Sequence, residues 1–449
     1  MKEFSEEKIQ RRRRLSSFQI IILGFAGVIL LGALLLMLPL STAEGVVTPF
    51  HETLFTATSA ACVTGLVVQD TGSYWSVFGQ AIIITMIQIG GLGVVTVAAA
   101  FTMLSGKKIS LMQRSTMQEA ISAPQVGGIV RLTGFIIKGT FLVELIGALA
   151  LMPVFLMDYG PKGIWMSFFH SISAFCNAGF DLMGTGDNRF ASMTGYMGNT
   201  AINVILILLI LVGGLGFQTW VDIGQKKHHA KKYTLQTKVI LVTSVVLILF
   251  PAIFFFCYEF DGMPLKERIL TSVFQAVTPR TAGFNTTDLT QMQGTSKVVM
   301  IFLMLVGGAP GSTAGGMKIT TIAVLFANMI ATLRQKEDIQ AFGRRIEEEA
   351  VKTAGAILLL YMTLSVGGAI AISVAEGLPI GDCLFETASA VATVGLTLNV
   401  TPGLGTFSQV ILIFLMFMGR VGCLTLIYAT FSRNKQNFVR LPQEKIMVG

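Results

Sequence analysis

Four short glycine-terminated phrases carry the chemistry that this sequence can perform. Each begins with phenylalanine, runs through small and hydroxyl residues, and reaches a glycine after a strand-like stretch. A dehydrated alkali cation needs several oxygen ligands at once, and backbone carbonyls supply them without a fixed charge. Glycine suits such a segment because it adopts positive φ without a steric penalty. The phrases are FTATSAACVTGL, FHSISAFCNAGF, FQAVTPRTAGF and FETASAVATVGL, with closing glycines Gly65, Gly179, Gly283 and Gly395.

A second glycine signal follows each phrase inside a long apolar run. The closing glycines are spaced by 114, 104 and 112 residues, so the phrase and its signal recur at a nearly fixed period. Such a period indicates one supersecondary unit repeated four times. The second signals are Gly90-Gly91-Leu92-Gly93, Gly213-Gly214-Leu215-Gly216, Gly307-Gly308 and Gly419-Arg420-Val421-Gly422.

Composition places these repeats in a membrane. Of 449 residues 53% are hydrophobic and 13% charged, and the mean hydropathy is +0.70. Soluble domains carry about 25% charged residues. A span takes ~20 apolar residues, and eight runs qualify, two per repeat. They are 18–40, 77–104, 132–157, 201–221, 239–258, 297–306 with 317–333, 353–375 and 408–431.

Between the two spans of a repeat the phrase itself is too short to cross. The helical part of the first, Phe55 to Ala61, would rise only about half of a ~30 Å hydrocarbon core. Non-helical backbone at membrane depth is tolerated where it lines water or is buried in protein. Four equivalent breaks therefore predict one shared aqueous axis; the alternative is four short helices that merely kink and pack. The negative C-terminal ends of the half-helices would favour a cation.

The predicted fold is an all-α integral membrane protein with four pseudo-symmetric helix–pore-loop–helix repeats around one central pore. It comprises eight transmembrane spans and four re-entrant half-helices. The repeats are expected at residues 18–105, 132–224, 238–333 and 352–432, with cytoplasmic tails at 1–17 and 433–449.

The basic residues predict the orientation. The net charge is +8, and Lys and Arg concentrate in the N-terminal tail, the linkers between repeats and the C-terminal tail. The positive-inside rule places these parts in the cytoplasm, so the basic excess reflects topology and not nucleic acid binding. The run after Arg11 to Arg14 is longer than a signal peptide core and reads as a retained span. Five scattered cysteines show no CxxC spacing, which argues against zinc and a disulfide framework.

The phrases TGL, NAGF, QAVTPRTAGF and ATVGL, with their spacing, resemble the Trk/Ktr/HKT superfamily of potassium transporters over nearly the whole chain. The match is nearest to the membrane subunit of bacterial Ktr systems. Glycine at all four filter positions implies K⁺ preference, since a serine in the first repeat accompanies Na⁺ permeation in that superfamily. By position, the K⁺ ligands would be mainly backbone carbonyls of Cys62, Val63, Thr64, Gly65, Cys176, Asn177, Ala178, Gly179, Arg280, Thr281, Ala282, Gly283, Ala392, Thr393, Val394 and Gly395.

The same resemblance implies a bacterial plasma membrane location and partners. Sodium-stimulated transport is expected, together with a homodimer of pores on a cytosolic ring of nucleotide-binding regulator subunits with Rossmann-like domains. The basic segments Lys226 to Lys232, Arg334 to Arg345 and Arg440 to Gly449 would form the docking surface, or act only as positive-inside anchors. No Walker A or strand-linked GxGxxG motif is present, so the chain is expected to bind no nucleotide.

A glycine-rich interruption in the third repeat predicts a gate. Five glycines and a proline among ten residues cannot hold an ordinary helix. The alternative is a passive kink, whereas the superfamily resemblance implies an intramembrane gating loop. Arg420 would repel cations on the axis, hydrogen-bond loop carbonyls, or do both. The gate residues are Gly307, Gly308, Gly311, Ser312, Thr313, Gly315, Gly316 and Arg420.

Four further polar residues have predicted roles. Arg280 should point away from the pore and brace its segment against an acid, with Glu52, Asp70 and Glu386 as candidates. Glu144 is a proton or sodium site, or a packed residue paired with a base such as Lys138. His170 and Asn177 would hydrogen-bond around the second half-helix.

Three classes of function can be compared from the sequence. The membrane potential supplies ~2.3 kcal/mol per charge per 100 mV, which suffices for channel-like uptake of K⁺. A sodium-permeable, K⁺/Na⁺- or K⁺/H⁺-symporting member of the same superfamily is the alternative. An intramembrane enzyme or an organic-substrate carrier would need a polar constellation at the midplane. The four histidines, at 51, 170, 228 and 229, do not form one, so no enzyme is expected.

Overall fold

The computed structural model describes residues 16–105, 109–121, 125, 127–186 and 188–422, and the isolated residues 442, 444 and 447. Within these residues the chain is nearly all helical, in agreement with the predicted class. The described strands are the two-residue β1 (Gln340–Ala341) and β2 (Arg344–Arg345), which pair antiparallel. The predicted tails, most of the docking tail and Cys423 lie outside the described residues.

Each repeat opens on a long apolar helix. These helices run for 20, 31, 25 and 29 residues, so each is long enough to cross a bilayer. The first begins with a capping box, in which the Ser16 hydroxyl accepts from the Gln19 N–H and the Gln19 side chain accepts from the Ser16 N–H. The helices are α2 (Ser17–Leu36), α7 (Ile129–Tyr159), α11 (Leu235–Phe254, extended by a π-helical turn Phe255–Glu259) and α15 (Glu348–Glu376).

Each repeat continues with a short helix that packs against its long one. All four short helices have proline at the N-cap, namely Pro49, Pro161, Pro264 and Pro379. Proline fixes φ and blocks extension of the helix upstream. With 12 to 14 residues, none can span a bilayer alone. They are α3 (Phe50–Ala61), α8 (Lys162–Phe175), α12 (Leu265–Val277) and α16 (Ile380–Val391).

The second helix is bent in the first two repeats, inside the apolar runs 77–104 and 201–221 that the sequence predicted as spans, and the sequence did not predict the bend. The two halves meet at 93° in the first repeat and at 95° in the second. Each bend contains a glycine at positive φ, Gly93 at 86° and Gly216 at 85°, which ends the first half. The halves are α4 (Val77–Leu92) with α5 (Val94–Leu104), and α9 (Thr200–Gly214) with α10 (Phe217–Lys226).

In the third repeat α13 (Gly294–Leu305) and α14 (Ile319–Leu333) flank the glycine-rich loop. In the fourth, α17 (Thr406–Val421) ends at Gly422 with φ 92°, and the remainder of the predicted span to residue 431 lies outside the described residues. A break near the second glycine signal is therefore shared by the first three repeats. By length and composition the described helices give four spans, or six if each bent pair is one; the count of eight stays a prediction.

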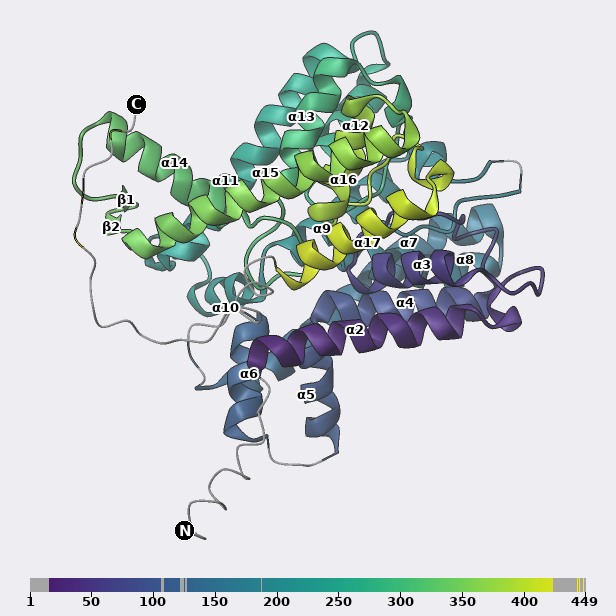
Figure 1. The fold of residues 1–449 in the computed structure, drawn as a ribbon, viewed down its shortest axis with the longest axis horizontal. Coiled ribbons are helices and arrows are strands. Elements are labelled where there is room, and N and C mark those ends of the chain that lie inside the picture. Colours follow the sequence, from purple (N-terminus) through teal and green to yellow (C-terminus); the bar gives the residue numbers. More distant parts are fainter. Residues whose placement is uncertain are drawn as a thin grey trace.

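The repeats close into a ring. The second helix of each repeat packs against the short helix of the next: α4 on α8, α9 on α12, α13 on α16, and α17 back on α3. In Figure 1 α17 lies between the purple helices of repeat 1 and the green helices of repeats 3 and 4. This cyclic packing produces the approximate fourfold arrangement.

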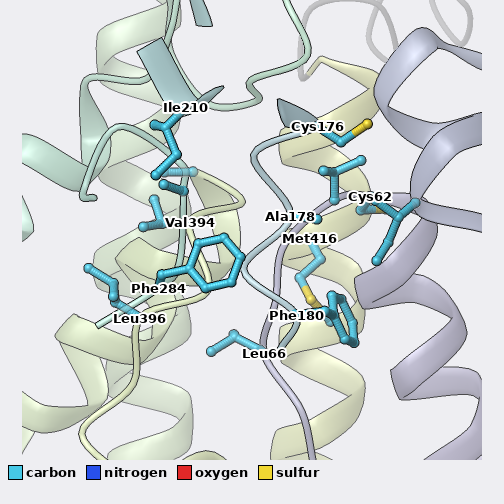
Figure 2. Close-up of a cluster of buried hydrophobic side chains, with 14 of the residues drawn as sticks. Cys62, Leu66, Cys176, Ala178, Phe180, Ile210, Phe284, Val394, Leu396 and Met416 are labelled. Atoms are coloured by element: carbon cyan, nitrogen blue, oxygen red, sulfur yellow. The ribbon is translucent and has the colours of Figure 1, made fainter. Parts of the chain in front are cut away.

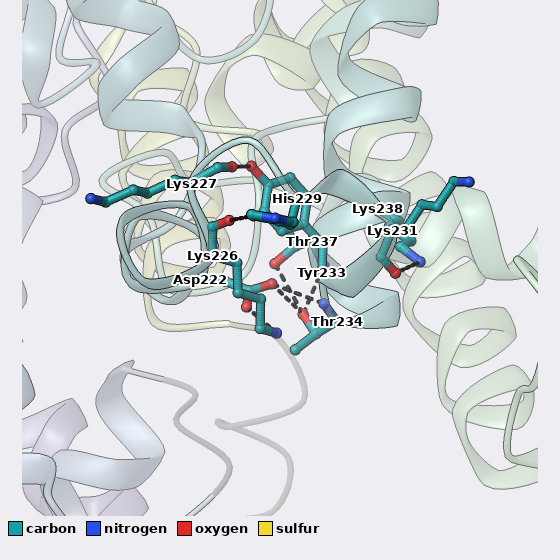
Figure 3. A network of polar contacts seen from close by, with 9 residues as sticks. All are labelled: Asp222, Lys226, Lys227, His229, Lys231, Tyr233, Thr234, Thr237 and Lys238. Atoms are coloured by element: carbon teal, nitrogen blue, oxygen red, sulfur yellow. Dashed lines mark hydrogen bonds and ion pairs between the residues drawn. The ribbon is translucent and has the colours of Figure 1, made fainter.

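Short elements connect the repeats. Helix α6 (Leu111–Ile121) packs on α2 and α5. The α10 helix is fastened to the start of α11 through Asp222, which accepts from Thr234 N (2.9 Å) and forms an ion pair with Lys226 (2.5 Å) (Figure 3). Single 3₁₀ turns occupy Pro39–Ser41, Thr194–Tyr196, Ala230–Lys232, Leu289–Gln291 and Thr401–Gly403.

Candidate functional site

The four closing glycines meet in one ring. Their φ angles lie between 68° and 96°, a region that side chains other than glycine rarely adopt. A Cβ added to any of them would lie 2.1 to 2.7 Å from backbone of the following segment. Glycine is therefore required both by conformation and by space. These contacts run from Gly65 to Ala178, from Gly179 to Gly283, from Gly283 to Val394 and from Gly395 to Thr64.

We call residues 62–65, 176–179, 280–283 and 392–395 the glycine segments. Two residues before each glycine, the backbone is again left-handed, although the residue is not glycine. Left-handed backbone costs an L-residue about 1–2 kcal/mol, and three of the four are β-branched. Because the same geometry recurs in all repeats, it belongs to the motif. The residues are Val63, Asn177, Thr281 and Thr393, with φ of 56°, 58°, 65° and 52°.

A hydroxyl residue at the end of each short helix holds the glycine segment in this shape. The residue before each glycine donates its N–H to the carbonyl of that hydroxyl residue at 2.8 to 2.9 Å. The Ser59 and Ser389 hydroxyls also accept from the N–H of Gly65 (3.1 Å) and Gly395 (3.0 Å). In the other two repeats, Ser173 and Thr278 donate to the carbonyl just beyond the glycine.

Sequence reasoning missed these hydroxyl residues. Their signal was a serine six residues before the glycine in three repeats, and a threonine five before it in the third.

The apolar side chains of the glycine segments pack in the protein core. Members of this buried cluster come from all four segments and the residues that follow them, and several are drawn in Figure 2. Labelled members include Cys62, Leu66, Cys176, Ala178, Phe180, Phe284, Val394 and Leu396.

A small cavity of about 50 Å³ lies next to the ring and is lined by all four glycines. It is on the side toward which the segments continue after the glycine, because Asp181, Asn285 and Thr397 also line it. Asp70 at its wall accepts from Phe190 N (2.9 Å) and from Ser73 N (2.8 Å). The cavity thus bears carboxylate and amide oxygens, groups that favour a cation.

On the other side of the ring lies the glycine-rich loop, residues 307–316. It is held at its base by a parallel bridge between Val306 and Met317. The Thr313 hydroxyl donates to the carbonyl of Phe175 (3.0 Å), at the end of α8. A Cβ on Gly315 would lie 1.8 Å from the Thr393 hydroxyl. The loop therefore abuts the glycine segments directly.

Arg420 ties this loop to the first repeat. Its guanidinium donates to the carbonyl of Thr313 in the loop and to the carbonyls of Gly90 and Gly91 (3.2 Å for Gly91) at the end of α4. Of the two roles that the sequence left open for Arg420, the structure shows the hydrogen bonds to carbonyls of the loop. Lys318 donates to the loop carbonyl of Ala314 at 2.8 Å. A cavity of about 360 Å³ lies beside the loop and is lined by both cations.

The second glycine signal lets the second helix approach the end of the short helix. A Cβ on Gly90, Gly213 or Gly419 would lie 2.0 to 2.1 Å from the last helical carbonyl of its own repeat. In the third repeat, a Cβ on Gly307 meets the loop itself, 2.4 Å from the carbonyl of Gly315. The loop there replaces the close helix contact of the other repeats.

The predicted acid partner of Arg280 was wrong. Its Nη2 donates to the Ser244 hydroxyl (3.1 Å), and Nε and Nη1 have no hydrogen-bond partner in the described structure. The three candidate acids are engaged elsewhere. Glu52 accepts from Gln69, Asp70 from Ser73 and Phe190, and Glu386 from Thr397, Leu398 and Thr401.

Glu144 does not pair with Lys138 either. Its carboxylate accepts from Gln88 Nε2 at 3.3 Å and from the Cys176 thiol at 3.8 Å, because α7 turns it toward α4 and the end of α8. His170 matches the predicted bracing role, since its Nε2 accepts from Leu182 N at 3.1 Å.

Comparisons with known proteins identify related cation transport proteins. Residues 2–440 match a protein family described as TrkH, cation transport protein. The chain is 40% identical to the potassium/sodium uptake protein NtpJ of Enterococcus hirae, covering 98% of each protein. It is 37% identical to the Ktr system potassium uptake protein B of Bacillus subtilis, covering 99% of each.

Among solved structures, the potassium transporter TrkH from Vibrio parahaemolyticus superposes with a TM-score of 0.72. The match covers 93% of this chain and 85% of that chain at 19% sequence identity. At this identity the likeness establishes the fold.

Proposed function

Because the chain belongs to the TrkH family of cation transport proteins, we propose that it conducts K⁺ across the plasma membrane through the ring of glycine segments. One observation carries the proposal: four positive-φ glycines meet in one ring, and each approaches the backbone of the following segment so closely that no Cβ fits, with a carbonyl oxygen of that segment within 3.0 Å of the Cβ position. Carbonyl oxygens replace the hydration shell of an alkali cation. The ligands are those of residues 62–65, 176–179, 280–283 and 392–395.

The alternative is transport of Na⁺, alone or coupled. The relative from Enterococcus hirae is named for potassium and sodium, whereas the one from Bacillus subtilis is named for potassium. A glycine at position 65, where the superfamily resemblance links serine to Na⁺ permeation, favours K⁺. A K⁺/Na⁺ or K⁺/H⁺ symporter would need a second binding site, and Glu144 is a candidate for one, because its buried carboxylate contacts the Cys176 thiol of the second glycine segment.

Uptake is driven by the membrane potential and stopped by the loop. A potential of ~100 mV contributes ~2.3 kcal/mol per charge, or roughly 50-fold accumulation. Residues 307–316 lie against the glycine segments, and the contacts of this loop with Phe175, Arg420 and Lys318 support a closed position. Opening requires that Arg420 release the Thr313 carbonyl.

Separate regulator subunits control the opening of the pore. The Bacillus subtilis relative is part of a named Ktr system, which supports an assembly of two pores on a ring of cytosolic nucleotide-binding regulator subunits. We place the basic linkers and both termini in the cytoplasm by the positive-inside rule. Sodium stimulation belongs to the same proposal, and the chain itself performs no chemical reaction.

The deciding experiment is uptake by a bacterial strain that lacks its own K⁺ transporters. K⁺ uptake is measured with and without Na⁺, and with and without a co-expressed regulator subunit. The proposal expects K⁺ uptake that Na⁺ increases and the regulator controls. Na⁺ uptake at a comparable rate would favour the alternative, and absence of any cation uptake would overturn both.

A further inference from the structure

A groove runs along the outside of repeat 3, away from the ring. It lies between α11, α13 and α14, has a volume of about 720 Å³, and is covered at one end by the β1–β2 hairpin. In Figure 1 α14 and the hairpin lie at the left edge of the molecule, on the opposite side from α3 and α8. No residue of the ring or the loop lines this groove.

The dimensions of the groove match one leaflet. Along α11 the lining runs from Val239 to Pro251, and along α14 from Ile322 to Arg334. Twelve helical steps rise about 18 Å, and one leaflet is about half of a ~30 Å hydrocarbon core. The groove therefore has the length of an acyl chain that begins at the hairpin and ends near the membrane midplane.

The walls of the groove are apolar, and several of their side chains are exposed in the described part of the chain. Phe250 is 67% exposed, Phe326 53% and Ile330 46%. The small residues Ala323 and Ala327 line the floor on α14, which leaves room between the larger side chains. Such a surface is stable against a hydrocarbon chain.

The mouth of the groove carries more positive than negative charge. Arg334, Lys336 and Asp338 all line it, and Asp338 is already paired with Arg345, with Oδ1 and Nε 3.0 Å apart. Neither Arg334 nor Lys336 forms a salt bridge with a described residue, since neither takes part in any of the five ion pairs.

Backbone geometry places these cations at the mouth. The chain reverses at Gln335, which has φ 51°. The Lys336 N–H then donates to the carbonyl of Ala331 (3.0 Å), which is the helix-ending pattern that returns the chain over the last turn. Phe342 of the hairpin, 52% exposed, lines the same end.

We propose that this groove binds one anionic phospholipid of the cytoplasmic leaflet. The phosphate lies between Arg334 and Lys336, and an acyl chain follows α11 and α14 to Phe250. Charge complementarity selects this occupant, because the two cations at the mouth match an anionic phosphate and the apolar walls beyond them match its acyl chain. The leaflet follows from the proposed orientation, whereas binding itself does not depend on it or on K⁺ transport.

The test is native mass spectrometry of the full purified chain mixed with phosphatidylglycerol or phosphatidylcholine, followed by flotation with vesicles of each lipid. The double variant Arg334→Gln/Lys336→Gln removes the headgroup site. Its matched control is Lys231→Gln/Lys232→Gln, which removes the same charge from the turn before α11. Ala327→Trp fills the groove with both cations intact, and Val245→Trp adds the same ring on α11 outside the lining.

We expect retained phosphatidylglycerol, and little phosphatidylcholine, on the native chain and both controls. The charge variant should weaken retention by roughly 10- to 30-fold, because two cations near an anionic headgroup are lost. Ala327→Trp should weaken it to a similar extent. Retention unchanged in either variant overturns the proposal. If Ala327→Trp separates a dimer while lipid retention persists, the groove is a subunit interface and the proposal fails. Neither readout requires transport, so these outcomes are independent of the proposed function.

Discussion

Replacing Gly65 with serine tests the ring directly. The residue has φ 96°, and a Cβ there would lie 2.5 Å from the carbonyl oxygen of Ala178 and 3.1 Å from the Cα of Gly179. Ordinary contact begins near 3.4 Å, so the two segments must separate by about 0.9 Å. A displacement above about 0.5 Å abolishes a productive ligand geometry, and the left-handed backbone adds about 1–2 kcal/mol of strain.

We expect Gly65→Ser to lower the preference for K⁺ over Na⁺ by at least about tenfold, which corresponds to ~1.4 kcal/mol of lost discrimination. Uptake of Rb⁺ in competition with Na⁺, in a K⁺-uptake-deficient strain and in reconstituted vesicles, measures this ratio. Gly65→Ala separates the steric effect of the Cβ from the hydroxyl as a new ligand. If displacement is the cause, alanine should reproduce most of the loss.

The matched control is Gly377→Ser. Gly377 also has positive φ, 69°, but nothing lies within 4 Å of an added Cβ. It should lose some thermal stability and keep its cation preference. If Gly65→Ser transports normally with an unchanged preference, or if Gly377→Ser loses selectivity equally, the closed ring does not set selectivity and the reasoning is refuted.

Four further predictions concern the loop and its surroundings. Arg420→Gln should raise K⁺ flux several-fold in reconstituted vesicles, because the bonds between the guanidinium and the loop are lost; a flux equal to that of the unsubstituted chain would contradict this. Thr313→Val should raise the vesicle K⁺ leak by roughly fivefold, since one hydrogen bond of about 1 kcal/mol no longer holds the loop closed. Ser389→Ala should reduce K⁺ preference at normal expression, because the Gly395 N–H loses its acceptor, and an unchanged uptake ratio would argue against the hydroxyl scaffold. Glu144→Leu should lower the unfolding temperature in detergent by several degrees while Glu144→Gln does not; equal melting would show that its polar contacts are dispensable.

Local properties of the chain made much of the fold predictable. Apolar run length marks a helix that crosses a bilayer wherever it occurs, so the long helices were evident. The closing glycines were evident for a similar reason, because a position that requires positive φ selects glycine whatever surrounds it. Repetition of both signals at one period indicated the four units and their convergence on an axis.

Other features depend on contacts that the sequence does not record. The runs through Gly93 and Gly216 stay apolar on both sides, so hydropathy could not separate a bend from a continuous span. Left-handed backbone at Val63 and Thr281 opposes the preference of β-branched residues, and only the hydroxyl scaffold and the neighbouring segments impose it.

For the charged side chains too, the sequence predicted one part and the tertiary structure decided the other. A buried guanidinium or carboxylate requires hydrogen-bonding partners, and the sequence established that requirement for Arg280, Glu144 and Arg420. Long flexible side chains reach several neighbours, so the choice among them follows from helix packing. The sequence by itself determined the repeats, the glycines and the identity of the buried charges. The tertiary structure decided that Arg420 joins the loop to α4, more than 300 residues away in the chain, because only the closed ring brings these repeats together.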